Sequence, residues 1–79
     1  MDQYVTGEII RTLREEKKMT QAELAEKLSV SDKTVSKWEN GRGYPDITLI
    51  EPIAQALGIS MIELLSGSNI VNENRNANM

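Results

Sequence analysis

The chain has 79 residues, enough for one small domain, and a formal net charge of −3. It contains no Cys and no His, which removes disulfides, Cys-ligated zinc, the thiol nucleophile and the commonest general base. No apolar run approaches the roughly 18 residues of a membrane span, and the N-terminus is no signal peptide. We therefore expect a cytoplasmic protein that is not an enzyme and needs no cofactor.

The net charge argues weakly against nucleic-acid binding, because proteins that bind polyanions are usually basic. The distribution of the charge matters more than its sum. Residues 31–46 are neutral, with three basic and three acidic side chains, whereas residues 47–79 carry Arg75 against Glu51, Glu63 and Glu73. A mildly acidic chain of this kind can still present one locally positive face.

Helical periodicity dominates the first part of the chain. An apolar stripe predicts a first helix that begins near Tyr4 or Thr6 and reaches Lys17, with an inner face formed by Val5, Ile9, Ile10 and Leu13. Thr20 and Glu23 have the spacing of a capping box, which opens a second helix. That helix buries Leu24, Ala25 and Leu28.

A third helix follows after only Ser29 and Val30. Ser31 is its expected N-cap, and Gly41 is suited to the left-handed position just past its end. The next residues, RGYPD, form a loop because Gly and Pro break helices.

A fourth helix carries Leu49, Ile50, Ile53, Ala54 and Leu57 and ends at Gly58. Pro52 lacks an N–H group, so we expect it within the first turn, with irregular backbone before it. Ser60 and Glu63 form a second capping box, which opens a short fifth helix that ends near Gly67. The result is an all-α domain of five short helices over residues 1–67, followed by an Asn-rich segment, 68–79, expected to be a disordered tail or linker.

The third helix has two different faces on a helical wheel. Val35 and Trp38 point inward, while the outer strip is polar and consists of Asp32, Lys33, Ser36, Lys37 and Asn40. Two helices joined by a short turn, with the second polar on its outer side, form a helix-turn-helix, whose second helix lies in the major groove of DNA. The wheel alone is equally compatible with an ordinary solvated helix face.

A wider segment resolves this ambiguity. The chain reads MTQAELAEKLSVSDKTVSKWENGRGYPD and then LIEPIAQALGISMIELLSG, and over about residues 5–67 it closely resembles the helix-turn-helix domains of phage repressors, Cro proteins and their bacterial relatives, the XRE family. The motifs that carry the resemblance are Thr20 and Gln21, Leu24 and Ala25, Val30 and Ser31, Trp38 to Gly41, Pro45, and Leu57 and Gly58. The resemblance implies a compact five-helix, lambda-repressor-like fold with the helix-turn-helix at helices 2 and 3.

The resemblance also implies roles for single residues. The positions that face base edges are Asp32, Lys33, Ser36 and Lys37, and the positions that contact the DNA backbone are Gln21, Thr34, Asn40 and Arg42. For Asp32, which favours the positive end of the helix dipole, a role in starting the helix is an equal alternative. Arg14 and Glu39 match an ion pair between the first and third helices that is structural rather than DNA-binding.

Other sites are disfavoured. The stretch NGRG has no preceding strand and no following GKS or GKT, so it is not a phosphate-binding loop of the nucleotide-binding kind. The acidic side chains at positions 15, 16, 23 and 26 have no His, Cys or Asp partner nearby, so we expect no metal there.

The sequence thus predicts a bacterial transcriptional regulator, a repressor, that binds a specific double-stranded DNA sequence as a homodimer on a two-fold-related operator. The alternative is a protein-interaction module on the same fold, either an adaptor or an antitoxin. Two interpretations of the tail remain open: a linker to a missing C-terminal sensing or Cys-rich metal-binding domain, or a segment whose Ile70 and Val71 cover a dimer interface.

Overall fold

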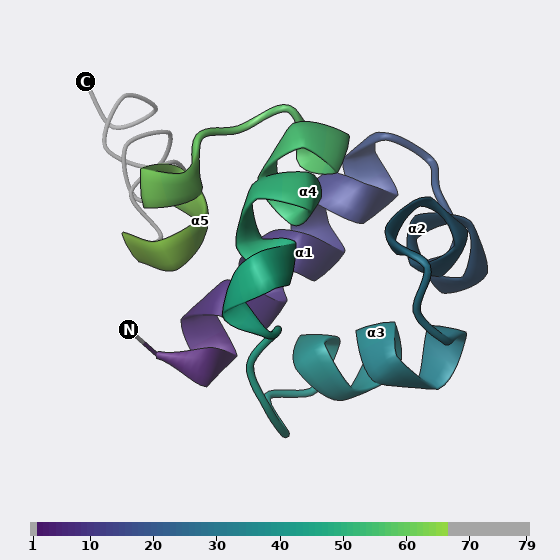
Figure 1. The fold of residues 1–79 in the computed structure, drawn as a ribbon, viewed down its shortest axis with the longest axis horizontal. Helices are drawn as coiled ribbons and strands as arrows, with labels where there is room; N and C mark the ends of the chain where they lie inside the picture. Colours follow the sequence, from purple (N-terminus) through teal and green to yellow (C-terminus); the bar gives the residue numbers. More distant parts are fainter. Residues whose placement is uncertain (1, 67–79) are drawn as a thin grey trace.

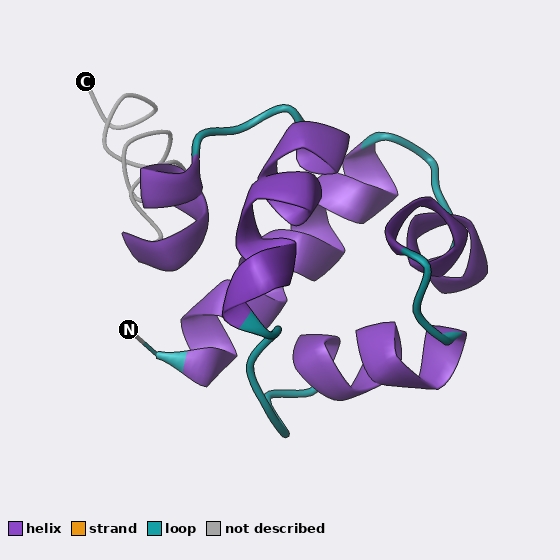
Figure 2. Ribbon diagram, in the orientation of Figure 1, coloured by secondary structure: helices purple, strands orange, loops and turns teal. Residues whose placement is uncertain are grey.

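The computed structural model describes residues 2–66, which fold into five helices and contain no strand (Figures 1 and 2). The helices are α1 (Gln3–Glu16), α2 (Gln21–Leu28), α3 (Asp32–Glu39), α4 (Ile47–Leu57) and α5 (Met61–Ser66). The predicted all-α class with five helices is confirmed. The expected domain end at Gly67, the tail 68–79 and the apolar dyad Ile70 and Val71 lie outside the described residues.

Helices α1 and α4 cross through the middle of the domain, with α2 and α3 on one side and α5 on the other (Figure 1). Helix α3 packs against both α1 and α2, and α5 packs against α1 and α4. The core draws on every helix, and its most deeply buried large side chains are Ile9, Ile10, Leu24, Val35, Ile53 and Leu64. The helix-turn-helix pair is therefore anchored to a core that the other helices complete.

The helices begin where side chains accept hydrogen bonds from free backbone N–H groups. Thr20 and Glu23 form the predicted capping box, with distances of 3.0 Å and 2.8 Å. Ser60 and Glu63 form the second box at the same two distances. Ser31 Oγ accepts from the N–H of Thr34 at 3.2 Å, so all three predicted N-caps are confirmed.

Two further caps were not predicted. Asp2 Oδ1 accepts from the N–H of Tyr4 at 2.7 Å, which starts α1 at Gln3, slightly earlier than expected. Asp46 Oδ1 accepts from the N–H of Thr48 at 2.9 Å and starts α4 at Ile47. Both caps extend a helix toward its N-terminus.

The early start of α4 corrects the prediction for Pro52. This residue lies in the second turn of a regular helix, not in the first turn after irregular backbone. Its ring nitrogen cannot donate the usual bond to the carbonyl of Thr48, so the helix lacks one hydrogen bond there. Burial of Ile50 and Ile53 on either side of Pro52 helps to keep the segment helical despite that loss.

The inner face of α1 also differs from the prediction at one end. Val5 was expected inside, but it is 41% exposed, while Thr6 and Gly7 are buried. The cause is the close approach of α3, since a Cβ atom on Gly7 would lie 2.1 Å from the carbonyl oxygen of Trp38. Only glycine lets the two backbones meet at this point.

Candidate nucleic-acid interface

The turn between α2 and α3 is built from local backbone geometry. Ser29 adopts the left-handed conformation, with φ 59° and ψ 39°, and its N–H and that of Val30 bond carbonyls of α2 at 3.2 Å and 3.0 Å. Ser31 then caps α3 at once. The chain therefore changes direction over very few residues, which is the connection that a helix-turn-helix needs.

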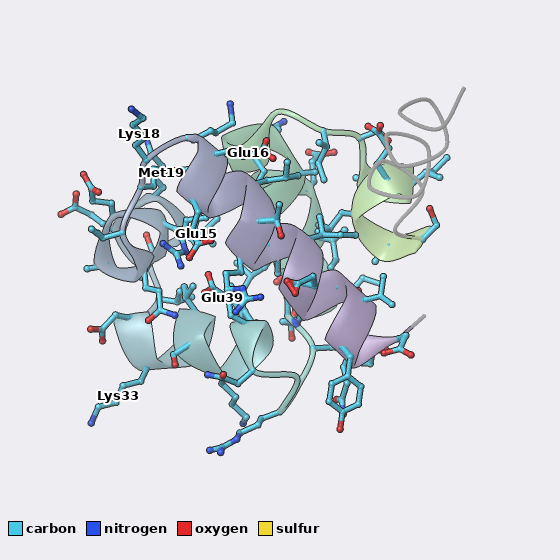
Figure 3. All side chains as sticks on the ribbon, turned by 180° about the vertical axis from the view of Figure 1, so that it is seen from behind. Glu15, Glu16, Lys18, Met19, Lys33 and Glu39 are labelled. Carbon is cyan, nitrogen blue, oxygen red and sulfur yellow. The ribbon has the colours of Figure 1, made fainter. Side chains whose placement is uncertain are left out.

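Helix α3 has a buried face and an exposed face, as predicted. Val35 and Trp38 are buried among α1 and α2, whereas Asp32, Lys33 and Lys37 are exposed. Lys33 extends away from the body of the domain (Figure 3). Within residues 2–66, neither lysine forms an ion pair, so both ammonium groups are available to a ligand.

The end of α3 is ordered by contacts within its last turn. Asn40 Nδ2 donates to the carbonyl oxygen of Ser36 at 2.8 Å and to its Oγ at 3.2 Å. The hydroxyl hydrogen of Ser36 is still available for another acceptor, because a hydroxyl both donates and accepts. The N–H of Arg42 bonds the carbonyl of Lys37 at 3.0 Å, with Gly41 at φ +69° between them. Arg42 is exposed directly beyond this turn.

Thr34 lies at the other end of α3 and is half-buried. Its hydroxyl is 2.9 Å from Oγ of Ser31, so it takes part in the cap of its own helix. Asp32 is exposed at the first position of that helix, where its charge favours the dipole. This position fits a role in starting the helix as well as it fits a base contact.

The structure contains the ion pair between α1 and α3. Arg14 Nε lies 2.6 Å from Glu39 Oε2, and Nη2 lies 3.0 Å from Oε1, a bidentate arrangement. The two side chains are 10% and 2% exposed, and Glu39 reaches from α3 into the space beside α1 (Figure 3). The hydrogen bond that Arg14 donates to Glu39 raises the pKa of Arg14, which is consistent with a charged pair.

Two contacts at this cluster were missed by sequence reasoning. Gln21 Nε2 donates to Glu39 Oε1 at 3.0 Å, and Arg14 Nη1 donates to the carbonyl oxygen of Met19 at 2.6 Å. Gln21 and Glu39 were assigned separate roles, one toward DNA and one in the scaffold, yet the structure joins them. No pattern in the sequence signals this contact, because the two residues belong to different helices.

Tyr4 is another residue that sequence reasoning missed. A Cβ atom on Gly41 would lie 2.4 Å from Cδ1 of its ring, so the ring of Tyr4 lies over the end of α3. The N-terminus of α1 thereby supports the loop that carries Arg42. Helix α3 is thus held at its start by α2 and at its end by α1.

Among residues 2–66, no helix is both long enough and apolar enough to cross a membrane. In the same range, no group of three or more acidic, His or Cys side chains is arranged to hold a metal ion. Glu15 and Glu16 lie at the surface near the end of α1 (Figure 3).

Several curated proteins are similar to this chain. The transcriptional activator BcrR of Enterococcus faecalis is 40% identical over 65 residues, which cover 82% of this chain and 32% of the activator. The immunity repressor of Bacillus phage phi105 is 33% identical over 67 residues, covering 85% and 46%. Multiprotein-bridging factor 1 of Candida albicans is 38% identical over 64 residues, covering 81% and 40%. The chain thus spans a third to a half of the length of these relatives.

Solved structures give the same fold. The P22 c2 repressor, crystallised with a synthetic operator, superposes with a TM-score of 0.75 at 34% identity, covering 78% of this chain and 94% of that chain. Hydroxypropylphosphonic acid epoxidase from S. wedmorenis superposes with a TM-score of 0.73 at 36% identity, but the match covers only 34% of that enzyme. The match therefore covers nearly all of the crystallised repressor chain but only a part of the epoxidase chain.

The family model described as helix-turn-helix matches residues 10–64, which span α2, α3 and α4, the second half of α1 and most of α5. This range includes the turn at Ser29, the polar face of α3 and the buried pair of Arg14 and Glu39. The chain belongs to the helix-turn-helix family of the XRE type.

Proposed function

We propose that this chain binds a specific double-stranded DNA sequence as part of a bacterial transcriptional regulator, a repressor, with α3 in the major groove. The observation that carries the proposal is the exposed polar face of α3, held rigidly on α1 and α2 through Val35 and Trp38. Its similarity to a phage repressor that was crystallised with an operator supports the same assignment. A repressor is favoured over an activator because two of the similar proteins are phage repressors.

The proposed base contacts come from Asp32, Lys33, Ser36 and Lys37. The ammonium groups of Lys33 and Lys37 can donate to O6 and N7 of guanine, and the Asp32 carboxylate can accept from the amino group of cytosine. The Ser36 hydroxyl can either donate a hydrogen bond to a base or accept one from it. These four side chains would read the operator sequence.

The proposed backbone contacts come from Gln21, Thr34, Asn40 and Arg42. Gln21 is the first residue of α2, where free N–H groups attract phosphate, and Arg42 supplies a positive charge just past α3. Contacts of this class set the register of the protein on the duplex without reading the sequence.

We further propose that two copies bind a two-fold-related operator whose half-site centres lie about one DNA turn apart. An exposed apolar surface on α4 and α5 supports dimer formation, since Ile47 is 84% and Ile62 is 74% exposed. A groove beside it is lined by Pro45, Ile47, Ile50, Met61 and Leu65. Sedimentation with the operator duplex should show two copies per duplex, and a persistent one-to-one complex would argue against the dimer.

The proposal includes no catalysis and places the protein in the cytoplasm, where its DNA would be. It also includes a further C-terminal domain for sensing or metal binding, because the similar curated proteins are much longer than the matched region. An antibody raised against residues 2–66 tests this on native cell extract. A band no larger than the 79-residue chain would contradict the further domain.

An adaptor that bridges proteins is the second candidate, favoured by the similarity to multiprotein-bridging factor 1. The two candidates differ in their ligand. An adaptor needs no preferred duplex, whereas a repressor must discriminate among sequences at physiological salt.

Selection from a pool of random DNA duplexes tests the main proposal. A repressor should enrich one sequence, and log K for that duplex should fall linearly with log salt concentration. The variant in which Lys33 and Lys37 both become Ala is the matched control, because both side chains are exposed and the fold should persist. A pool that remains random after selection with folded protein would contradict sequence-specific binding.

A further inference from the structure

Glu39 lies where the scaffold meets the proposed phosphate contact. Its carboxylate accepts three hydrogen bonds, two from Arg14 and one from Gln21 Nε2 at 3.0 Å. Because an ionised carboxylate only accepts, the NH2 end of the Gln21 amide must face it. The orientation of this amide is therefore determined by the chemistry of its neighbour.

The start of α2 retains further donors around Gln21. Its capping box uses the N–H groups of Thr20 and Glu23, and the backbone N–H groups of Gln21 and Ala22 take no part in it. The amide of Gln21 carries two N–H bonds, of which Glu39 accepts one. The second side-chain N–H is available to another acceptor at the same helix end.

Arg14 connects the cluster to the backbone that leads into α2. Its Nη1 donates to the carbonyl oxygen of Met19 at 2.6 Å, and Met19 directly precedes the N-cap Thr20. Since the side chains of Arg14 and Glu39 are almost fully buried, solvent competes little for these bonds. One carboxylate thus joins the end of α3, the end of α1 and the start of α2.

We propose that Glu39 is a positioning residue for DNA binding: it holds the amide of Gln21 so that the second side-chain N–H can donate to a phosphate oxygen. This inference rests on the proposed function. A glutamine that is already ordered loses less rotamer freedom when DNA binds than a mobile one does. Glu39 thereby increases the affinity for DNA through Gln21, in addition to pairing with Arg14.

A purely structural role for Glu39 makes a different prediction. In that case, replacing Glu39 weakens the fold but leaves the contact between Gln21 and phosphate intact in the molecules that remain folded. The two roles separate when binding is measured at a temperature at which every variant is folded, as monitored by Trp38 fluorescence.

The test uses the duplex recovered by selection, with one phosphate at a time replaced by an uncharged methylphosphonate. Gln21→Ala should lower affinity about tenfold, the loss expected for one hydrogen bond to a charged group, and Glu39→Met, whose side chain offers no oxygen to the Gln21 amide, should lower it by up to the same factor. Both should become insensitive to the same methylphosphonate that weakens wild-type binding. The double variant should be no more than about twofold weaker than Gln21→Ala, because coupled residues are not additive.

Ile53→Val is the matched control, a small change in the buried part of α4. It should lower stability and keep the wild-type sensitivity to each methylphosphonate. The proposal is overturned if the losses of Gln21→Ala and Glu39→Met multiply in the double variant, or if Glu39→Met keeps the sensitivity that Gln21→Ala loses. Failure to recover any duplex would instead count against the proposed function.

A second measurement needs neither DNA nor a variant. NMR relaxation of side-chain amides in the free protein should give Gln21 an order parameter near that of rigid backbone, about 0.85. Exposed Gln55, which makes no side-chain hydrogen bond within residues 2–66, supplies the mobile reference in the same spectrum. An order parameter for Gln21 below about 0.6 would overturn the positioning role even if Glu39→Met fails to fold.

Discussion

The two faces of α3 are built by different rules, although they share one short helix. The inner face contains Val35 and Trp38 in the core and Glu39 in a buried cluster, so each side chain there has neighbours from other helices. The outer face, with Lys33 and Lys37, makes no ion pair among the described residues. The inner face therefore holds the helix, while the outer face is free to change with the operator.

The largest test of this difference is Glu39→Ala. Removing the carboxylate leaves the guanidinium of Arg14 buried without its partner, which should lower the free energy of unfolding by about 3 kcal/mol. Urea denaturation followed by Trp38 fluorescence measures the effect. Asp32→Ala, on the exposed face of the same helix, is the control and should change stability by less than about 0.5 kcal/mol. Equal midpoints for Glu39→Ala and wild type would show that the buried pair contributes nothing to the difference between the faces.

Gly7→Ala tests the inner face from the side of α1. The added methyl group would meet the carbonyl oxygen of Trp38, so α1 and α3 must move apart, at a cost of about 2 kcal/mol in unfolding free energy. At an ordinary helical position the same change stabilises the fold by about 0.5–1 kcal/mol. The sign of the change in unfolding free energy therefore distinguishes a close helix contact from an ordinary helical position. Thermal unfolding by circular dichroism measures it, and a higher Tm in the variant would rule out the close approach.

Lys33→Ala and Lys37→Ala test the outer face. Each should leave Tm unchanged, because both side chains are exposed, and should reduce discrimination at one operator base pair by about 1 kcal/mol, since an ammonium group donates as a single point. Competition binding against operators with single base changes measures this loss. A variant that loses stability but keeps its full sequence preference would reverse the roles assigned to the two faces.

The smallest effect on stability is expected for the capping box of α2. Its side chains are exposed, like those of the outer face of α3, but their role is structural, like that of the inner face. The hydrogen bond from the backbone N–H of Thr20, joined by the bond with its side chain, lowers the pKa of Glu23 below its ordinary value of 4.5. A carboxyl group whose pKa is lower in the folded state stabilises the fold above that ordinary value, and this contribution is lost as the pH falls through the folded pKa. Tm should therefore decrease below about pH 4.5, and Glu23→Gln, which still accepts the bond, should show a smaller decrease. Identical pH profiles would show that another group is responsible.

Much of the helix-turn-helix could be predicted from short-range patterns. Thr20, Ser31 and Ser60 were assigned as caps because their side chains bond N–H groups only three residues away, and Gly41 was assigned to a left-handed position. The pairing of Arg14 with Glu39 depended on a resemblance to a known family rather than on local pattern. The contact of Gln21 with Glu39 was missed because nothing within either helix indicates it.

One error lies where two helices meet, and the other lies at the start of a helix. Val5 was placed in the core and Pro52 in a first turn, because a hydrophobic stripe does not show how closely a neighbouring helix approaches or where an aspartate cap begins a helix. The sequence by itself determined the helices, three of their N-caps and the inner and outer sides of α3, since these follow from interactions within one or two turns. Only the tertiary structure decided that α1 touches α3 at Gly7 and that Arg14, Gln21 and Glu39 share one buried cluster, because contacts between helices depend on packing distances and crossing angles that no local pattern encodes.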